Sequence, residues 1–194
     1  MNLPLISNSW LVIVWFGLLG LCMGSFVNVV SHRLPIIRKL GPNEDGNQLQ
    51  KLVEKHGKYT LSYPRSLCPC CDTKIKTHHN IPLLGWLLLR GRCNACGSSI
   101  SIKYPVTELL FGAAFAGYVA FEGVWLAGLI SLPMMAIAYC LLVIRLQTKR
   151  VVGPLALAYV VAFVAQVTLT QFGYSAYSRS EEHTSELQSP CGSR

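Results

Sequence analysis

The sequence predicts an all-α polytopic membrane protein, with about four transmembrane helices and a small zinc-ribbon-like loop domain on the cytoplasmic side. Of the 194 residues, 52% are hydrophobic and only 13% are charged, whereas soluble domains carry roughly 25% charged residues. The apolar residues gather in long runs without charge. Between the first two runs lie two CxxC pairs, a spacing typical of a metal site.

The first apolar run, residues 10–30, contains 21 residues without a charge. A helix of this length rises about 1.5 Å per residue and crosses a hydrocarbon layer of about 30 Å. A cleaved signal peptide is the rival interpretation, but no basic segment precedes the run, and the run is too long for one. We therefore expect a first span in residues 1–31 and a loop domain in residues 32–104.

Three further spans are expected in residues 105–172. Residues 106–144 hold only two charged side chains, Glu108 and Glu122, and are long enough for two helices that turn near Glu122. Another uncharged run, residues 151–169, is long enough for a fourth span.

Pro105 suits the first turn of the second span, where its missing amide hydrogen costs nothing. Glu108 is then expected in that turn, where the helix dipole favours a carboxylate. Structural capping is therefore an alternative to any functional role for Glu108.

The C-terminal segment changes character. Three of the nine acidic residues fall within residues 181–186, and no apolar period is present. The segment resembles a translated sequencing-adapter peptide, so we expect residues 173–194 to be a tail that is non-native from about residue 178. An ordinary disordered terminus is the alternative.

Basic residues predict the orientation. Of 17 Lys and Arg residues, 12 lie in residues 31–104 and three in residues 145–150. Four alternating spans place both loops on one side, which the positive-inside rule makes the cytoplasm. The net charge of +8 then reflects topology and contact with anionic lipid. Binding to nucleic acid is not expected.

The cysteines predict a structural zinc site formed by Cys68, Cys71, Cys93 and Cys96. Each CxxC pair places two thiolates on one tight turn, and two such turns supply four tetrahedral sulfur ligands. A closed sulfur shell leaves no position for water, so the metal is expected to hold the fold.

Four alternatives to this zinc site remain open, and the simplest is two unconnected CxxC turns in reduced form. Disulfides are disfavoured if the loop faces a reducing compartment, and a redox CxxC pair lacks the surrounding βαβ pattern. His78 and His79 lie between the pairs and offer alternative ligands, although four sulfurs already suffice.

The sequence contains few of the residue patterns that catalyse hydrolysis. The chain contains no GxSxG or HExxH motif, and its two aspartates, Asp45 and Asp72, lie outside the apolar runs. An aspartic peptidase requires two carboxylates that are close enough to share a proton. We therefore assign no catalytic residue.

Four stretches share their order and spacing with one known family. They are GSFVNVVSHRLP (24–35), CPCC (68–71), NIPLLGWLLLRGRCNAC (80–96) and ISIKYPVTEL (100–109). Together they resemble the N-terminal portion of the type IV prepilin peptidases, the bifunctional leader peptidase/N-methyltransferases of aspartic peptidase family A24. Besides the cysteines, the residues that match the family motifs are Gly24, Ser25, Asn28, Arg33, Pro35, Asn80, Pro82, Arg90, Gly91, Pro105 and Glu108.

The resemblance implies a multi-pass enzyme of the bacterial inner membrane, with a periplasmic N-terminus and a cytoplasmic cysteine loop. Such enzymes cut the leader from prepilins of type IV pili or pseudopilins of type II secretion, and then methylate the new N-terminus with S-adenosylmethionine. Zinc and S-adenosylmethionine are the implied cofactors, and the membrane and prepilin substrates are the implied partners.

The chain departs from the family where the catalytic groups are expected. The family's first catalytic aspartate lies in a stretch like IDxxTxxxPD, and Arg145 stands at that position here. The second motif, GxGDxK, is absent, and an arginine cannot act as a general base. We predict a truncated or degenerate prepilin peptidase that is inactive as a peptidase. The alternative is a non-catalytic zinc-bearing membrane module that binds prepilin or an assembly partner.

Overall fold

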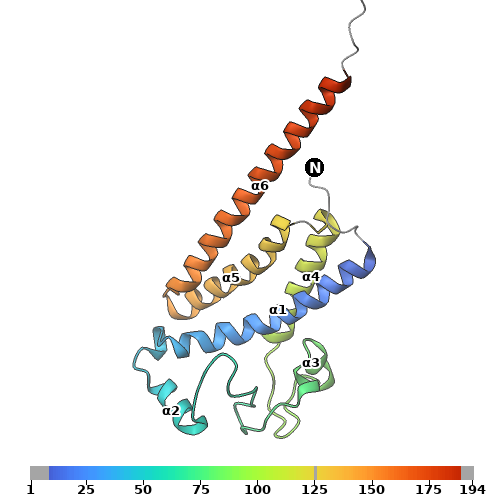
Figure 1. Cartoon of the computed structure of the whole chain (residues 1–194). Helices are drawn as coiled ribbons and strands as arrows, with labels where there is room; N and C mark the ends of the chain where they lie inside the picture. Colours follow the sequence, from blue (N-terminus) through green and yellow to red (C-terminus); the bar gives the residue numbers. More distant parts are fainter. Residues whose placement is uncertain (1–8, 125, 189–194) are drawn as a thin grey trace, which may run out of the picture.

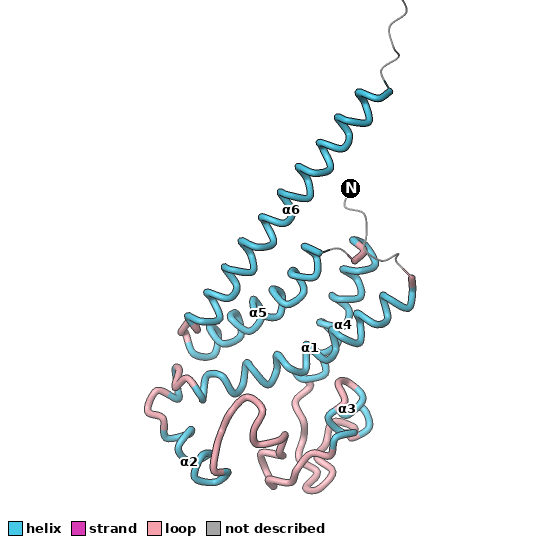
Figure 2. The backbone as a smooth tube through the Cα atoms, viewed as in Figure 1, coloured by secondary structure: helices cyan, strands magenta, loops and turns pink. Residues whose placement is uncertain are grey.

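The computed structural model describes residues 9–124 and 126–188 of the chain (Figure 1). Across these residues it contains helices and turns, but no strand longer than an isolated bridge (Figure 2). The helices are α1 (Trp10–Ile37), α2 (Asn47–His56), α3 (Leu84–Leu88), α4 (Lys103–Glu122), α5 (Leu126–Thr148) and α6 (Gly153–Gln188), with short 3-10 turns η1 (Gly41–Asn43) and η2 (Thr77–Asn80). The predicted all-α class is confirmed.

Four of these helices are long and apolar enough to cross a membrane. The candidate spans have 20 to 28 residues and are Trp10–Ile37, Lys103–Glu122, Gly128–Thr148 and Gly153–Phe172. The predicted number of spans is therefore confirmed. The remaining elements, η1, α2, η2 and α3, come from residues 38–102 between α1 and α4, a segment that we call the loop domain. Figure 1 shows α2 and α3 below α1, at opposite ends of this segment.

Glycines allow α1 and α4 to approach closely. A Cβ added to Gly24 would lie 2.7 Å from the Cα atom of Glu108, and one added to Gly20 would lie 2.4 Å from the carbonyl oxygen of Phe111. Small residues at such crossings are typical of packed membrane helices. Gly24 of the GSF motif therefore has a packing role.

The buried core lies where α1, α4 and α5 meet. Its members are apolar or weakly polar side chains: Val27, Val30, Phe111, Phe115, Leu132, Ala136 and Cys140. Helix α6 runs alongside α5 (Figure 2), where Gln166 Nε2 donates a hydrogen bond to Ser131 Oγ at 2.7 Å. The core thus fixes α1, α4 and α5 relative to one another.

Two helices extend beyond the predicted boundaries. Helix α1 continues past residue 31 to Ile37, with Pro35 inside it, because polar residues that end an apolar run do not end a helix. Helix α6 continues through residues 173–188, where Glu, Leu and Gln are good helix formers. No break in the backbone therefore marks the expected start of the tail, and residues 189–194 lie outside the described part.

Candidate metal centre

The first cysteine pair lies on a tight turn closed by backbone hydrogen bonds. The Cys68 amide donates to the Thr73 carbonyl at 3.0 Å, and the Asp72 amide donates to the Cys68 carbonyl at 2.9 Å. Leu67 and Lys74 pair across the turn in an antiparallel bridge. Asp72 has a positive φ of 52°, a conformation that Asp tolerates better than most residues.

The second pair repeats this turn 25 positions later. The Cys93 amide donates to the Ser98 carbonyl at 2.8 Å, and the Gly97 amide donates to the Cys93 carbonyl at 2.9 Å. Arg92 and Ser99 form the matching antiparallel bridge. Gly97 adopts the positive φ, 70°, that its counterpart has in the first turn. The loop domain therefore contains two equivalent cysteine turns.

These two turns bring four sulfur atoms into one cluster. The Sγ atoms of Cys68, Cys71, Cys93 and Cys96 all lie within 4.8 Å of one another. Cys68 Sγ is 3.7 Å from Cys96 Sγ, and Cys71 Sγ is 3.9 Å from Cys93 Sγ. Four sulfurs at about 2.3 Å from a central zinc would be about 3.8 Å apart in a regular tetrahedron. The donor set and its spacing therefore fit a zinc ion.

Hydroxyl groups surround the sulfur cluster. Thr73 Oγ1 lies 3.3 Å from Cys71 Sγ, and Ser98 Oγ lies 3.2 Å from Cys96 Sγ and 3.5 Å from Cys68 Sγ. The hydrogen bond with Ser98, followed by backbone hydrogen bonds in the first turn, lowers the pKa of Cys68 to about 6. The Ser98 hydroxyl is also the largest cause that lowers the pKa of Cys96. Thiolates available at neutral pH favour metal binding.

The sequence prediction did not include these two hydroxyl residues. A signal for them exists, because Thr73 and Ser98 each follow the second cysteine of a CxxC pair by two positions. At this repeated position the hydroxyl oxygen accepts a hydrogen bond from the thiol of that cysteine. Partners of this kind orient metal ligands and tune them.

The alternative ligands lie outside the cluster. Among the described residues, the group that can hold a metal at this place contains the four cysteines and neither His78 nor His79. The two histidine rings lie on η2 and face each other edge-on at 4.2 Å between centroids. The described cysteines are free thiols, and their sulfur separations exceed the roughly 2.0 Å of a disulfide bond.

Arg33 connects the first span to the loop domain. Its Nη1 donates to the Thr60 carbonyl at 2.9 Å, and its Nη2 donates to the Pro64 carbonyl at 2.8 Å. The guanidinium carbon also lies 5.4 Å from the centroid of the Tyr59 ring. The planar fork of an arginine suits such divergent acceptors better than a lysine would. Arg33 therefore holds the segment that leads to the first cysteine turn.

Asn28 connects the same helix to the start of α4. Its Nδ2 donates to the Tyr104 carbonyl at 3.3 Å. Pro105 follows in the first turn of α4, as the sequence predicts. Its side chain is buried.

Glu108 has a different role from the predicted one. It lies beyond the first turn of α4, because that helix begins at Lys103, so the prediction that Glu108 occupies the first turn is wrong. Its side chain is buried, and Oε2 accepts a hydrogen bond from the Leu83 amide at 2.6 Å. Leu83 immediately precedes α3 and has a positive φ of 61°. The carboxylate therefore satisfies a donor at the start of another helix.

Gly91 and Trp86 support the second cysteine turn. Gly91 has a positive φ of 67°, and a Cβ added there would lie 2.8 Å from Trp86 Cζ2. Trp86 Nε1 donates to the Ile100 carbonyl at 3.2 Å, while the Ile100 amide donates to the Gly91 carbonyl at 2.7 Å. Glycine is therefore required at position 91 both for backbone conformation and for space.

The other motif residues flank these contacts. Ser25 is half-buried on α1 and Pro35 is buried near the end of α1. Asn80 ends η2, Pro82 precedes α3, and Arg90 is exposed just before the second cysteine turn. No contact shown for these residues assigns them a chemical role.

The two aspartates and Arg145 lie in separate places in the described part of the chain. Arg145 lies exposed in the last turn of α5. Asp45 accepts a hydrogen bond from the Asn47 amide at 3.1 Å, and Asp72 forms an ion pair with Lys55 at 2.5 Å. Both aspartates lie in the loop domain, outside the candidate spans.

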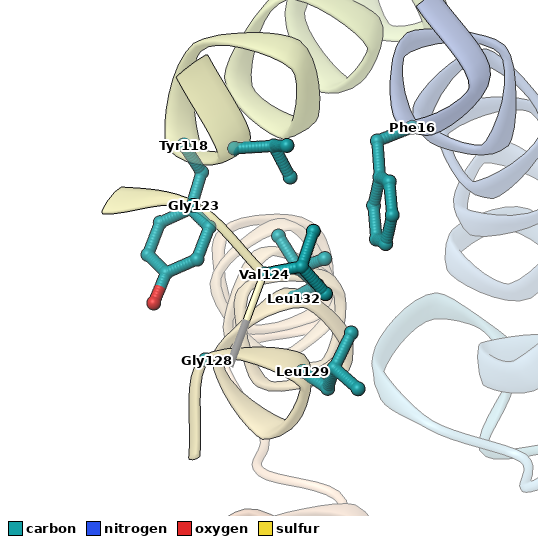
Figure 3. Close-up of a pocket in the computed structure, with 8 residues that line it drawn as sticks. Phe16, Tyr118, Gly123, Val124, Gly128, Leu129 and Leu132 are labelled. Atoms are coloured by element: carbon teal, nitrogen blue, oxygen red, sulfur yellow. The ribbon is translucent and has the colours of Figure 1, made fainter. Parts of the chain in front are cut away.

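A small hollow lies at the other end of α4, far along the chain from the cysteines (Figure 3). It is open to solvent and is lined mainly by apolar groups, including Phe16, Leu129 and Leu132. The Tyr118 hydroxyl points away from it (Figure 3).

A known protein family matches the first part of this amino-acid sequence. The family model described as Bacterial Peptidase A24 N-terminal domain matches residues 18–121. This range contains most of α1, both cysteine turns and nearly all of α4. No solved structure matches the chain.

Curated relatives carry the same family's names. A prepilin leader peptidase/N-methyltransferase of Stutzerimonas stutzeri is 44% identical over 128 residues, which cover 64% of this chain and 44% of the relative. One from Pectobacterium carotovorum subsp. carotovorum is 40% identical over 126 residues (63% and 42%). A type 4 prepilin-like proteins leader peptide-processing enzyme of Escherichia coli O78:H11 is 44% identical over 103 residues (50% and 35%).

The chain spans less than half the length of these three relatives. Its four apolar helices and its relatives identify it as a membrane protein. The resemblance inferred from the sequence motifs is confirmed, and the chain belongs to the bacterial peptidase A24 N-terminal domain family.

Proposed function

We propose that this chain forms the membrane anchor and zinc-stapled loop of a prepilin leader peptidase/N-methyltransferase. The observation that supports the proposal best is the pair of equivalent cysteine turns, which the family match includes. Two motif residues, Arg33 and Glu108, then fasten this loop to α1 and α4, and a third, Asn28, joins α1 to α4. Motif residues thus build a loop domain with one fixed placement against the spans.

Zinc is proposed as a structural cofactor. Four thiolates close its coordination shell, so the bound ion would stabilise the fold and would supply no activated water. The loop has few buried apolar side chains of its own, and small units of this kind depend on such staples. S-adenosylmethionine is proposed only from the family name, and no residue of this chain is assigned to it.

The proposed location is the bacterial inner membrane, with the cysteine loop in the cytoplasm. Twelve Lys and Arg residues in residues 31–104 support this orientation. The proposed substrates are prepilins or pseudopilins, from type IV pilus or type II secretion systems.

We further propose that the 194-residue polypeptide alone has no leader-peptidase activity. Arg145 stands where a catalytic aspartate is expected, and the two aspartates present lie in the loop domain. Loss of catalytic groups removes several powers of ten in rate. The test mixes the purified protein in detergent with a prepilin and follows leader removal, with an active relative such as the Stutzerimonas stutzeri enzyme as positive control. Leader removal by this polypeptide would refute the proposal.

A non-catalytic role is the second candidate, because side-chain hydrogen bonds of Arg33 and Glu108 fasten the loop domain to the spans and would hold it in place as a binding module. In this role the chain would bind prepilin or an assembly partner and leave it uncut. Co-purification of unprocessed prepilin with the chain would support this role. A failure to bind prepilin under conditions in which the relative binds it would exclude it.

A further inference from the structure

Helix α3 carries an apolar surface that the described residues do not cover. Four side chains of this segment are 45% to 67% exposed: Ile81, Leu84, Leu87 and Leu88. They are consecutive or one helical turn apart, and the surrounding loop is polar. Apolar surfaces of this kind mark interaction sites.

The depth of α3 indicates what covers this surface. Helix α4 has 20 residues, which span about 30 Å, the thickness of the hydrocarbon layer. Glu108 lies five residues beyond Lys103, so its Cα is about 7.5 Å along the helix from that end. Because the Glu108 carboxylate binds the Leu83 amide, α3 is held near the level of the lipid boundary. Figure 1 shows α3 close to the lower end of α4.

The backbone of α3 is suited to an apolar environment. The Leu83 amide is satisfied by Glu108 at 2.6 Å. The Gly85 amide donates to the Ile81 carbonyl at 2.8 Å, and the Leu87 amide donates to the Leu83 carbonyl at 3.1 Å. Non-helical backbone is tolerated at membrane depth only when its polar groups have partners.

Charged residues follow the apolar surface in the sequence. Arg90 and Arg92 follow α3, and Lys103 begins α4; all three are exposed. Basic side chains close to a membrane surface are attracted to anionic lipid headgroups. Interfacial segments typically bury their apolar face about 5–10 Å into the boundary between headgroups and acyl chains, which agrees with the depth of Glu108.

We propose that residues 81–89 form an interfacial segment that inserts Leu84, Leu87 and Leu88 into the lipid boundary. The loop domain is then fastened to the bilayer itself as well as to α1 and α4. Lipid is favoured over a protein partner because it surrounds every copy of the protein at this depth. This inference depends on the membrane-spanning helices and is independent of the proposed zinc and of prepilin processing.

The test places the photoreactive amino acid p-benzoylphenylalanine at single positions of the full chain in bacterial membranes. Leu87 and Leu88 are the test sites. Leu109 on α4, which is 54% exposed, is the lipid-facing control. Lys51 on α2, which is exposed, is the water-facing control. Adducts formed on illumination are identified by mass spectrometry.

The expected result is lipid adducts at Leu87 and Leu88 in at least roughly tenfold excess over Lys51, since apolar burial of one leucine favours the lipid side by about this factor. The adduct yield at Leu109 shows that the reaction reports lipid contact. Yields at Leu87 and Leu88 equal to that at Lys51 would overturn the proposal. Adducts mainly with prepilin or with a second copy of the chain would also overturn it, in favour of a protein interface.

Discussion

The Glu108 carboxylate accepts a hydrogen bond from the Leu83 amide at 2.6 Å and thereby fastens α3 to the second membrane-spanning helix. Glu108 is buried, and the Leu83 amide belongs to the N-cap residue of α3, at a helix end where backbone donors have no partner within the helix. The Glu108 side chain, which belongs to the membrane-spanning helix α4, therefore accepts a hydrogen bond from a backbone amide of the loop domain.

Glu108→Ala is expected to destabilise the protein by about 1–3 kcal/mol, because the Leu83 amide loses its acceptor in a buried place. Thermal unfolding in detergent measures this loss. Glu108→Gln retains an acceptor oxygen and is expected to recover most of the stability. Glu122→Ala, at an exposed position, is the matched control and should have little effect. Equal stability of the Ala and Gln variants at position 108 would contradict the assignment.

Metal content tests the four-sulfur site. The purified protein is expected to hold one zinc per chain, and Cys68→Ser or Cys93→Ser should lose it, because each removes one of four clustered ligands. Cys70→Ser is the matched control, since Cys70 is exposed and lies outside the cluster. Elemental analysis after gel filtration gives the stoichiometry. Unchanged zinc in the Cys68 and Cys93 variants would rule out this site.

Acid release of the metal tests the environment of Cys68. The Ser98 hydrogen bond and backbone hydrogen bonds lower the pKa of Cys68 to about 6, whereas the pKa of Cys71 is raised. Protons therefore compete with the metal for Cys68 increasingly as the pH falls through about 6. Zinc is therefore expected to be retained at neutral pH and released as the pH falls below about 6. A zinc-sensitive dye follows the release. Metal loss at neutral pH would contradict the prediction.

Ser98→Ala tests whether the Ser98 hydroxyl sets the pH at which zinc is released. Removal of the Ser98 hydroxyl takes away the largest cause that lowers the pKa of Cys68. The release midpoint is therefore expected to move to higher pH. Ser99→Ala, at an exposed neighbouring position, is the control and should leave the midpoint unchanged.

Three glycine-to-alanine variants separate backbone strain from steric contact. At Gly91 a Cβ meets both a positive φ of 67° and Trp86 at 2.8 Å, whereas Gly97 has a φ of 70° and open space. Gly97→Ala is expected to cost about 1–2 kcal/mol of stability from backbone strain alone. Gly91→Ala is expected to cost more, because Trp86 must also shift.

The control for this series is Gly153→Ala, at a position in α6 with open space around the added Cβ. It is expected to be neutral or slightly stabilising, since alanine favours helix. Chemical denaturation of the detergent-solubilised variants ranks them. Equal losses at positions 91 and 97 would show that the contact with Trp86 is unimportant.

Local sequence patterns were sufficient to predict the membrane spans and the four clustered cysteines. Uncharged runs of about 20 residues predicted the four candidate spans, because crossing a hydrocarbon layer imposes a length and an apolar composition on the chain. The CxxC spacing selected Cys68, Cys71, Cys93 and Cys96, because two ligands on one turn are already close in the sequence. These signals are short-range and need no knowledge of the rest of the fold.

Only the tertiary structure decided which distant groups meet. Arg33 finds the Thr60 and Pro64 carbonyls, Glu108 finds the Leu83 amide, and Ser98 reaches Cys68 across the two turns. The sequence marked Arg33 and Glu108 as motif residues but gave no partner, and for Glu108 it favoured a wrong position in the helix. Such partners depend on how α1 and α4 cross at their glycines and on where the loop folds back, and no local pattern encodes that geometry.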